Sequence, residues 1–291
     1  DLYCGGLIRR SLEFFRLVCK LRKEEFDLSF VLQNAMAFRL LICLVGVSIR
    51  VGFGSGRKDL FLTHSVSSQK IQNESESYLD LLRELDIPAV LEKTFYYLSV
   101  EEEDFLGLFI ERHGIASGEE VIAIAPGGGE SSKRRMFTKR WPVKNYIELI
   151  QRLQRERSSR VILVGESDDR EVANSIIQVS PDCLDATDLS FGYMASVFRR
   201  CNLFIGNGSG PHHIAGAIGV PSIGIFGPTD PNQWDPLDQN SSVVINPVEC
   251  HPCFIDETFP KCSHIRCLTS VTVDDVWQQL ELTLPHEKNV T

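Results

Sequence analysis

Short apolar runs alternate with segments of helical periodicity in the second half of the chain, and this rhythm constrains the fold more than any other feature of the sequence. Four runs consist almost wholly of apolar or small residues: 121–125, 160–165, 203–206 and 222–227. Helical spacing follows in four segments: 143–153, 168–178, 191–200 and 210–219. Apolar strands separated by helices form parallel sheets that are covered on both faces. The sequence therefore predicts an α/β fold with a doubly wound domain.

The first half of the chain repeats this pattern less completely. Its predicted elements are strands at 26–32 and 49–53 and helices at 35–45 and 76–85, with a polar stretch at 65–75. The length of 291 residues corresponds to about two domains. A linker near residues 115–120, which contains Gly118, would separate them. We expect an incomplete first domain at 1–118 and a complete second domain at 119–291.

Charge and cysteine content limit the partners and the compartment. The net charge of −9 argues against broad nucleic-acid binding, because no excess of Lys and Arg is available to displace phosphate counterions. The nine cysteines are an odd number in a mid-sized chain, unlike the dense framework of a small secreted domain. We therefore expect a reducing compartment and a cytoplasmic protein.

No membrane-spanning segment is predicted. The most apolar run, residues 40–49, has half of the about 20 residues needed to cross a bilayer, so a buried helix leading into a strand explains it better. No strongly basic amphipathic helix is evident, although contact with a membrane surface stays open. The chain begins with Asp1 instead of Met and has no targeting signal. We expect either that an upstream segment was removed or that the sequence is a fragment.

Ligands of parallel α/β sheets bind at the carboxyl ends of strands, and three loops there carry candidate residues. The first loop begins at Pro126 and contains Gly127 and Gly128. Five cations follow it within eight positions: Lys133, Arg134, Arg135, Lys139 and Arg140. Consecutive glycines let backbone N–H groups approach a ligand, and the cations would neutralise a phosphate. The loop is neither a Walker motif nor GxGxxG, and a flexible turn with a solvated basic surface is the alternative.

The second loop, residues 206–213, joins a predicted strand to a predicted helix. Unpaired N–H groups and the positive end of the helix dipole make such a junction an anion site. The glycines at 208 and 210 remove side chains that would block an approaching phosphate. His213 would donate to that phosphate or simply be packed, and Ser209 would contact it or cap the helix.

The third loop carries a cysteine cluster. Its members are Cys250, Cys253, Cys262 and Cys267. A CxxC pair with two later cysteines resembles zinc-ligand spacing, but the second pair is not CxxC. Four reduced or buried thiols without a metal are the favoured alternative.

Taken together, these loops resemble glycosyltransferase family 9, the ADP-heptose:lipopolysaccharide heptosyltransferases. The most specific part of the resemblance is residues 207–215, followed by Gly-Val-Pro-Ser at 219–222 and Phe-Gly-Pro-Thr-Asp-Pro at 226–231. It also includes Lys-Arg-Trp-Pro at 139–142 and the spacing of the four cysteines. Similarity covers most of the chain and is strong from about residue 121 to 282.

This resemblance implies a GT-B fold, in which two Rossmann-like domains face each other across a cleft. In the family the carboxy-terminal domain holds the ADP-sugar donor, and the amino-terminal domain offers the lipid-linked acceptor and a catalytic Asp. The implied reaction transfers heptose or a related sugar, with inversion, to a lipopolysaccharide core acceptor and requires no cofactor. It also implies that the protein acts in the cytoplasm, with peripheral contact to the inner face of the bacterial inner membrane.

The resemblance also assigns roles by position. Lys139 would be the catalytic cation, because its ammonium would stabilise the leaving ADP as the glycosidic bond breaks. The other expected donor contacts are Gly127, Gly128, Asp169, Leu189, Gly208, Ser209, Gly210 and His213. Asp169 and Leu189 fall where the family contacts the nucleoside.

Two departures from the family pattern bear on activity. Gly208 stands where most members have an Asp close to the donor sugar. The chain also has no counterpart of the family's opening strand and Gly-Asp loop, which carries the catalytic Asp. A non-catalytic nucleotide-sugar-binding protein is therefore the alternative function. A nicotinamide-dependent dehydrogenase is weaker, because it would need GxGxxG after its first strand and an acidic residue about 20 positions later.

Overall fold

Two compact units, Asp1–Leu91 and Glu92–Thr291, divide the chain in the computed structural model. The structure describes residues 7–33, 35–54, 59–67, 71–128, 130–131, 134–135, 137–237, 240–254, 262 and 264–285. Both units contain parallel β-sheets, which confirms the predicted α/β class.

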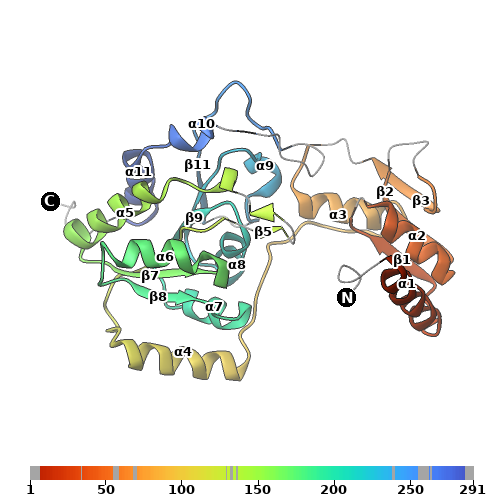
Figure 1. The fold of residues 1–291 in the computed structure, drawn as a ribbon, viewed down its shortest axis with the longest axis horizontal. Helices are drawn as coiled ribbons and strands as arrows, with labels where there is room; N and C mark the ends of the chain where they lie inside the picture. Colours follow the sequence, from red (N-terminus) through yellow and green to blue (C-terminus); the bar gives the residue numbers. More distant parts are fainter. Residues whose placement is uncertain are drawn as a thin grey trace. The chain divides into compact units, whose positions relative to one another are not determined.

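The first unit has a three-stranded parallel sheet in the order β1-β2-β3 (Figure 1). The strands are β1 (Leu28–Val31), β2 (Ile49–Gly54) and β3 (His64–Ser67), and the helices are α1 (Leu7–Arg22), α2 (Met36–Val45) and α3 (Glu74–Arg83). The sequence did not predict α1 and β3, and β3 begins the stretch interpreted as polar. Its residues His-Ser-Val-Ser contain a single apolar side chain, so hydrophobic pattern alone gives no strand signal there.

Helix α1 corrects a further expectation, because it is both amphipathic and basic. Its last turn carries Lys20 and Arg22, and its apolar residues Val18 and Leu21 pack against α2. On α3, Leu81 packs with Val51 and Phe53 of β2. The first unit is therefore held by two small cores, one under α1 and one under α3.

The second unit is built on six parallel strands in the order β11-β10-β9-β4-β7-β8. They are β4 (Val121–Ala125), β7 (Arg160–Gly165), β8 (Leu184–Thr187), β9 (Leu203–Asn207), β10 (Ser222–Ile225) and β11 (Ser241–Val244). Four of these strands were predicted. The outer strands β8 and β11 were not, because Leu-Asp-Ala-Thr and Ser-Ser-Val-Val are too polar to give a continuous apolar run.

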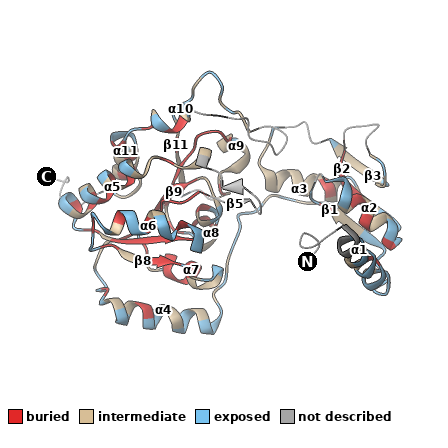
Figure 2. Cartoon of the chain, in the orientation of Figure 1, coloured by how far each residue is buried: buried red, intermediate tan, exposed pale blue. Residues whose placement is uncertain are grey.

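Helices cover both faces of this sheet, as its uniformly buried strands require (Figure 2). The covering helices are α4 (Val100–His113), α5 (Val143–Arg152), α6 (Arg170–Ile177), α7 (Phe191–Phe198), α8 (Gly210–Ile218) and α11 (Val273–Thr283). Ile122 and Ile124 of β4 share a core with α5, α6 and α11. Val121 and Ala123, on the opposite side of the same strand, share a core with α4, α7 and α8.

Helix α4 belongs to the second unit. The Tyr193 hydroxyl on α7 donates to Glu101 on α4 over 2.8 Å, and Phe105 stacks on the ring of Tyr193 with 4.2 Å between centroids. The turn at 115–120, expected to be an inter-domain linker, connects α4 to β4 within this unit. The two compact units thus divide upstream of the boundary predicted at residue 118.

Strand order places the candidate loops next to each other. From the central strand β4 the chain moves outward through β7 and β8, and then returns to β9, β10 and β11 on the other side. The direction of winding therefore reverses between β4 and β9, where Ala125, the last residue of β4, is paired with Gly206. In open α/β sheets, ligands bind at such a switch point outside the carboxyl ends of the strands.

Short elements complete the second unit: β5 (Glu130–Ser131), β6 (Arg134–Arg135), α9 (Pro231–Trp234), α10 (Arg266–Thr269), the 3₁₀ turns Phe137–Lys139 and Ser167–Asp169, and a π turn at Leu153–Arg157. Among the helices of the described ranges, none combines the length and the apolar character needed to cross a bilayer.

Candidate functional site

Asn207 ties together the loops that leave β4 and β9. Its side chain is fully buried; the amide Nδ2 donates to the carbonyl oxygen of Gly127, and Oδ1 accepts the Trp141 N–H over 2.9 Å. The Trp141 indole N–H in turn donates to the Val271 carbonyl over 2.9 Å. The first loop, the second loop and the segment carrying Lys139 are thereby fixed to one another and to the core.

Gly127 and Gly128 make room for an ion pair under the first loop. A Cβ atom on Gly127 would lie 2.1 Å from Cγ of Asp169, and one on Gly128 would lie 2.7 Å from Cγ of Arg140. Arg140 donates to Asp169 over 2.9 Å, and each of the two side chains is only 13% exposed. Asp169 also accepts the Glu166 N–H over 3.2 Å. These contacts give both glycines and Asp169 a role in shaping the loop, whereas nucleoside contact by Asp169 stays a prediction.

Ser209 precedes α8 but does not cap it. Its hydroxyl donates to the Asn207 carbonyl over 3.1 Å, and no side-chain bond to the helix N-terminus is formed. The alternative interpretation of Ser209 as the helix cap is therefore wrong. Pro211 has no N–H, and the N–H groups of His212 and His213 donate to the Ser209 carbonyl, so this N-terminus offers an anion the Gly210 N–H and the positive dipole end. The geometry leaves the junction at Ser209 and Gly210 suited to phosphate.

Gly208 lies against the ring of Phe226, and its N–H donates to the Ile225 carbonyl over 3.2 Å. A Cβ atom at position 208 would come within 2.7 Å of Phe226 Cε1. The Phe226 side chain is 1% exposed, so its ring has little freedom to move away. An Asp at 208 therefore requires a change at Phe226 as well.

Lys139 and His213 lie near enough at this edge of the sheet for the charge of the lysine to act on the imidazole. Burial lowers the pKa of Lys139, whose Nζ lies 5.5 Å from the centroid of the Phe254 ring. Partial burial, and then the nearby charge of Lys139, lower the pKa of His213, which lies on the exposed side of the first turn of α8. The first loop's basic segment and the second loop therefore bring a cation near an imidazole, whereas contact of either with a donor stays a prediction.

The preceding histidine has a different environment. His212 is fully buried; its Nε2 lies 3.1 Å from the Ser222 hydroxyl and 3.2 Å from the Ser241 hydroxyl, and its ring stacks on Phe204. Burial lowers its pKa to about 3, so it is neutral at physiological pH. His212 anchors α8 to the sheet, which leaves His213 as the histidine of the candidate site.

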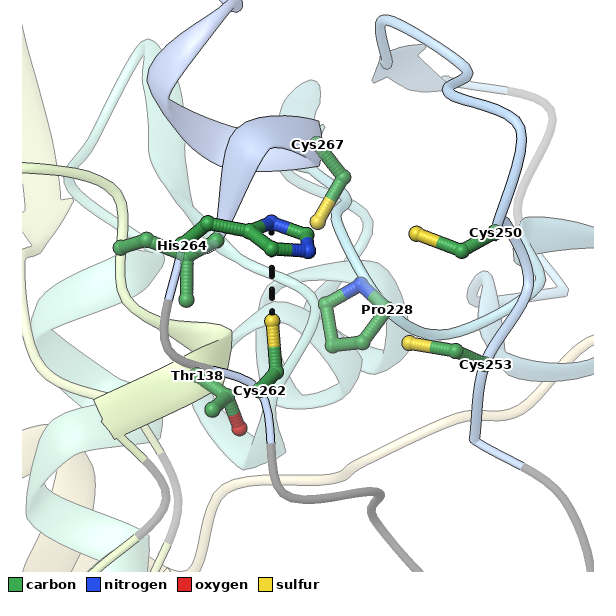
Figure 3. A pocket seen from close by; sticks show the side chains of 8 residues that line it. Thr138, Pro228, Cys250, Cys253, Cys262, His264 and Cys267 are labelled. Carbon is green, nitrogen blue, oxygen red and sulfur yellow. Dashed lines mark hydrogen bonds between the residues drawn. The ribbon is translucent and has the colours of Figure 1, made fainter.

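The four cysteines of the third loop line one small space, here called the thiol pocket (Figure 3). The lining is completed by Thr138, Pro228, His264 and Ile265. The sulfur atoms of the four cysteines point toward this common space. Burial, followed by the neighbouring thiols, raises the pKa of Cys267 to about 11. In the part of the chain that the structure describes, no three potential ligands already have metal-site spacing.

The remaining predicted residues lie apart from this constellation or outside the description. Leu189 is half-buried and packs against the core under α7 and α8. Lys133 lies outside the described residues, as do the side chains of Arg134 and Arg135. Sequence reasoning missed the parts played by Arg140, Phe226 and Phe254. Asn207 stood within a quoted motif, where its position between Gly206 and Gly208 at the end of a predicted strand was the available signal.

Comparison with known proteins gives a consistent result. The sequence profile of glycosyltransferase family 9 (heptosyltransferase) matches residues 14–264. The chain is 27% identical over 236 residues to lipopolysaccharide heptosyltransferase 3 of Escherichia coli, covering 78% of this chain and 67% of the relative. It is 22% identical over 285 residues to lipooligosaccharide heptosyltransferase 2 of Campylobacter jejuni, covering 94% of this chain and 80% of the relative.

Solved structures show the same fold. The glycosyltransferase family 9 protein of Veillonella parvula aligns with a TM-score of 0.77 at 20% identity, covering 97% of this chain and 80% of that chain. The Escherichia coli ADP-heptose lps heptosyltransferase II aligns with a TM-score of 0.73 at 22% identity, covering 95% of this chain and 82% of that chain. These likenesses confirm the expected GT-B fold class.

Proposed function

Because the chain belongs to glycosyltransferase family 9, we propose that it is an inverting glycosyltransferase that moves a heptose, or a related sugar, from an ADP-sugar to a lipopolysaccharide core acceptor. Relatives named as heptosyltransferases support this substrate class. The reaction breaks the bond between the anomeric carbon and the diphosphate oxygen, and it forms a new bond to the acceptor hydroxyl oxygen. The acceptor proton passes to a base, and ADP leaves with the electron pair.

One observation carries the donor half of this proposal: Lys139 and His213 converge beside the uncapped N-terminus of α8, at the switch point of the sheet. We assign the diphosphate to the backbone of Ser209 and Gly210 and to the Lys139 ammonium. A cation held at this point stabilises the negative charge that develops on the leaving diphosphate. No cofactor is assigned a part in this step.

ADP binding tests the donor site. Lys139→Ala is expected to weaken ADP binding roughly ten- to a hundredfold in calorimetric titration, because a charge-assisted hydrogen bond contributes about 1.5–3 kcal/mol. Lys144→Ala is the matched control, since Lys144 is exposed on α5 and its loss changes the net charge equally. Equal, negligible ADP binding by wild type and Lys139→Ala would contradict the proposed donor site.

The contact between Gly208 and Phe226 favours a second function, a non-catalytic nucleotide-sugar-binding protein. Phe226 fills the space that a side chain at 208 would enter, so the donor side of the site has no carboxylate at that position. The double variant Gly208→Asp/Phe226→Leu distinguishes the two functions. Sugar transfer by wild type supports the enzyme, whereas ADP-sugar binding without transfer, with transfer gained only by the double variant, supports the binding protein.

We further place the protein in the cytoplasm, with α1 in contact with the anionic inner face of the membrane. Leu12 and Phe15 on α1 are 55% and 62% exposed, and the helix ends in exposed basic residues. Apolar and basic residues on one helix are typical of attachment to anionic lipid. Leu12→Ser/Phe15→Ser should reduce co-sedimentation with anionic vesicles, whereas Leu108→Ser on α4, 66% exposed in the wild type, should not. Equal co-sedimentation of both variants and wild type would refute this contact.

A further inference from the structure

The thiol pocket lies outside the residues assigned to the donor and carries chemistry that the proposed reaction does not use. Its four cysteines come from two stretches of the chain: Cys250 and Cys253 from one, and Cys262 and Cys267 from the other. The described cysteines form no disulfides. The pocket is partly open and its volume is about 10 Å³, which is room for one water molecule or one ion.

The chemistry of these sulfur atoms suits a soft metal ion. Figure 3 shows the four thiols around a common space, with the ring of His264 beside Cys262 and Cys267. The Nδ1 atom of His264 accepts the Arg266 N–H over 3.2 Å, and a neutral imidazole has a single acceptor nitrogen. The thiols are therefore the ligand set, and four sulfur ligands select zinc or iron over oxygen-seeking cations.

We propose that the thiol pocket binds one thiophilic divalent ion, zinc or ferrous iron, and that this ion holds the segment carrying Lys139 in place. The thiols face the common space but do not already stand at ligand spacing, so binding of the ion requires them to move closer together. Each thiol that becomes a ligand loses its proton to solvent, which makes binding tighter as pH rises. The ion is structural, and no electron or group transfer passes through it.

Neighbouring contacts link the pocket to the donor site. Thr138, which lines the pocket, immediately precedes Lys139 in the same 3₁₀ turn. The N–H groups of Cys253 and Phe254 both donate to the Pro228 carbonyl over 3.0 Å, and Pro228 also lines the pocket. Phe254 is the residue whose ring lies beside the Lys139 ammonium. An ion that joins the two cysteine stretches would therefore restrain Phe254, whose ring lies beside Lys139, and the wall of the pocket that Thr138 forms.

Metal titration tests the site directly. The purified chain, without an affinity tag that binds metals, is stripped by a chelator and titrated with Co²⁺. We expect one equivalent to produce the intense sulfur-to-cobalt and visible bands of tetrahedral thiolate coordination. Cys250→Ser/Cys253→Ser should abolish these bands, and Cys19→Ser/Cys43→Ser, which removes two thiols of the first unit, should leave them unchanged. Absence of the bands in wild type, or their persistence in the first variant, overturns the proposal.

A second measurement on the wild-type chain does not depend on any variant folding. One equivalent of Zn²⁺ should protect four thiols from a disulfide reagent under native conditions, and protection of none would overturn the site. Elemental analysis of the protein as purified then distinguishes zinc from iron.

The positioning role rests on the proposed function and has its own readout. Stripped protein should bind ADP several-fold more weakly than the Zn²⁺-loaded protein. Unchanged ADP affinity overturns the positioning role. If neither form binds ADP, the proposed donor site fails, while the cobalt spectra still decide whether the pocket binds metal.

Discussion

The two units of the chain share the same alternation of strands and helices, but the strands of their sheets are buried to different extents. In the second unit both faces of the sheet are covered, and the central strands β4, β7 and β9 are buried along almost their whole length. In the first unit the edge strand β1 keeps Leu28 37% exposed, and Leu32, just beyond that strand, is 47% exposed. Stability of a parallel sheet depends on cover for both faces, so the second unit should be the more stable one.

This difference bears on where a precise ligand site can be built. Phosphate-binding loops must hold backbone N–H groups in fixed positions, and a rigid scaffold provides that. The loops after β4 and β9 are joined by a buried asparagine and braced by an ion pair. We attribute the placement of the proposed donor site to this rigid edge of the second unit.

The largest expected effects come from core substitutions that destabilise one unit and not the other. All three tryptophans lie in the second unit, so tryptophan fluorescence follows its unfolding alone. Phe204→Ala, at a fully buried position, should cost the second unit about 3–5 kcal/mol and shift the fluorescence transition in urea. Leu81→Ala, also fully buried, should cost the first unit about 2–5 kcal/mol and shift only the transition seen by circular dichroism.

The contrary result is equally clear. If Leu81→Ala shifts the fluorescence transition as far as the circular dichroism transition, the two units unfold together and their separate stabilities have no meaning. Leu282→Ala on α11, at a position 70% exposed in the wild type, serves as a control that should leave both transitions nearly unchanged.

A smaller effect is a loss of stability at acid pH. It sharpens the comparison of the two units because His212, which causes it, lies in the second unit. The pKa of His212 falls from 6.5 to about 3 on burial, so the folded unit binds fewer protons than the unfolded chain. Its contribution to stability is fully present above pH 6.5 and is lost as the pH falls toward 3. At pH 5 the loss should be about 2 kcal/mol.

His212→Gln removes this proton while retaining hydrogen-bonding atoms beside Ser222 and Ser241. The difference in unfolding free energy between pH 7 and pH 5, followed by tryptophan fluorescence, should be about 2 kcal/mol smaller in this variant than in wild type. The same pH dependence in both proteins would show that His212 does not contribute to acid sensitivity.

The sequence predicted the inner strands well because each is a run of apolar residues, and such runs need no knowledge of neighbours. It missed β8, β11 and β3. These segments contain few apolar side chains, and they form strands only because a neighbouring strand offers hydrogen bonds. It also missed α1, where basic residues interrupt the apolar spacing. Hydrophobic pattern therefore identified every inner strand of the two parallel sheets but, of their four edge strands, only β1.

The candidate site shows the same division between local and distant contacts. Glycine-rich loops, Lys139 and His213 were recognisable because their chemistry is local to each loop. The ion pair of Arg140 was not recognisable, because its partner Asp169 lies 29 residues away in the sequence. The two meet only because β4 and β7 are neighbours in the sheet. Likewise, nothing in the sequence places Phe254 beside Lys139. Pairings of this kind come from the order of the strands.

The smallest predicted effect tests whether the rigid edge of the second unit alters the chemistry of Lys139. Burial lowers the pKa of its ammonium below the usual 10.5, so the positive charge is lost at a lower pH than on an exposed lysine. ADP affinity should therefore fall as the pH rises from 8 toward 10.5, at a lower pH than with an exposed lysine, in a range where the diphosphate is already fully ionised. In Lys139→Arg the guanidinium stays charged, and ADP affinity should remain flat over that range, whatever its absolute value. Calorimetric titration at half-unit pH intervals measures both profiles. A flat wild-type profile, or parallel declines in the two proteins, would mean that the Lys139 ammonium does not contact the diphosphate.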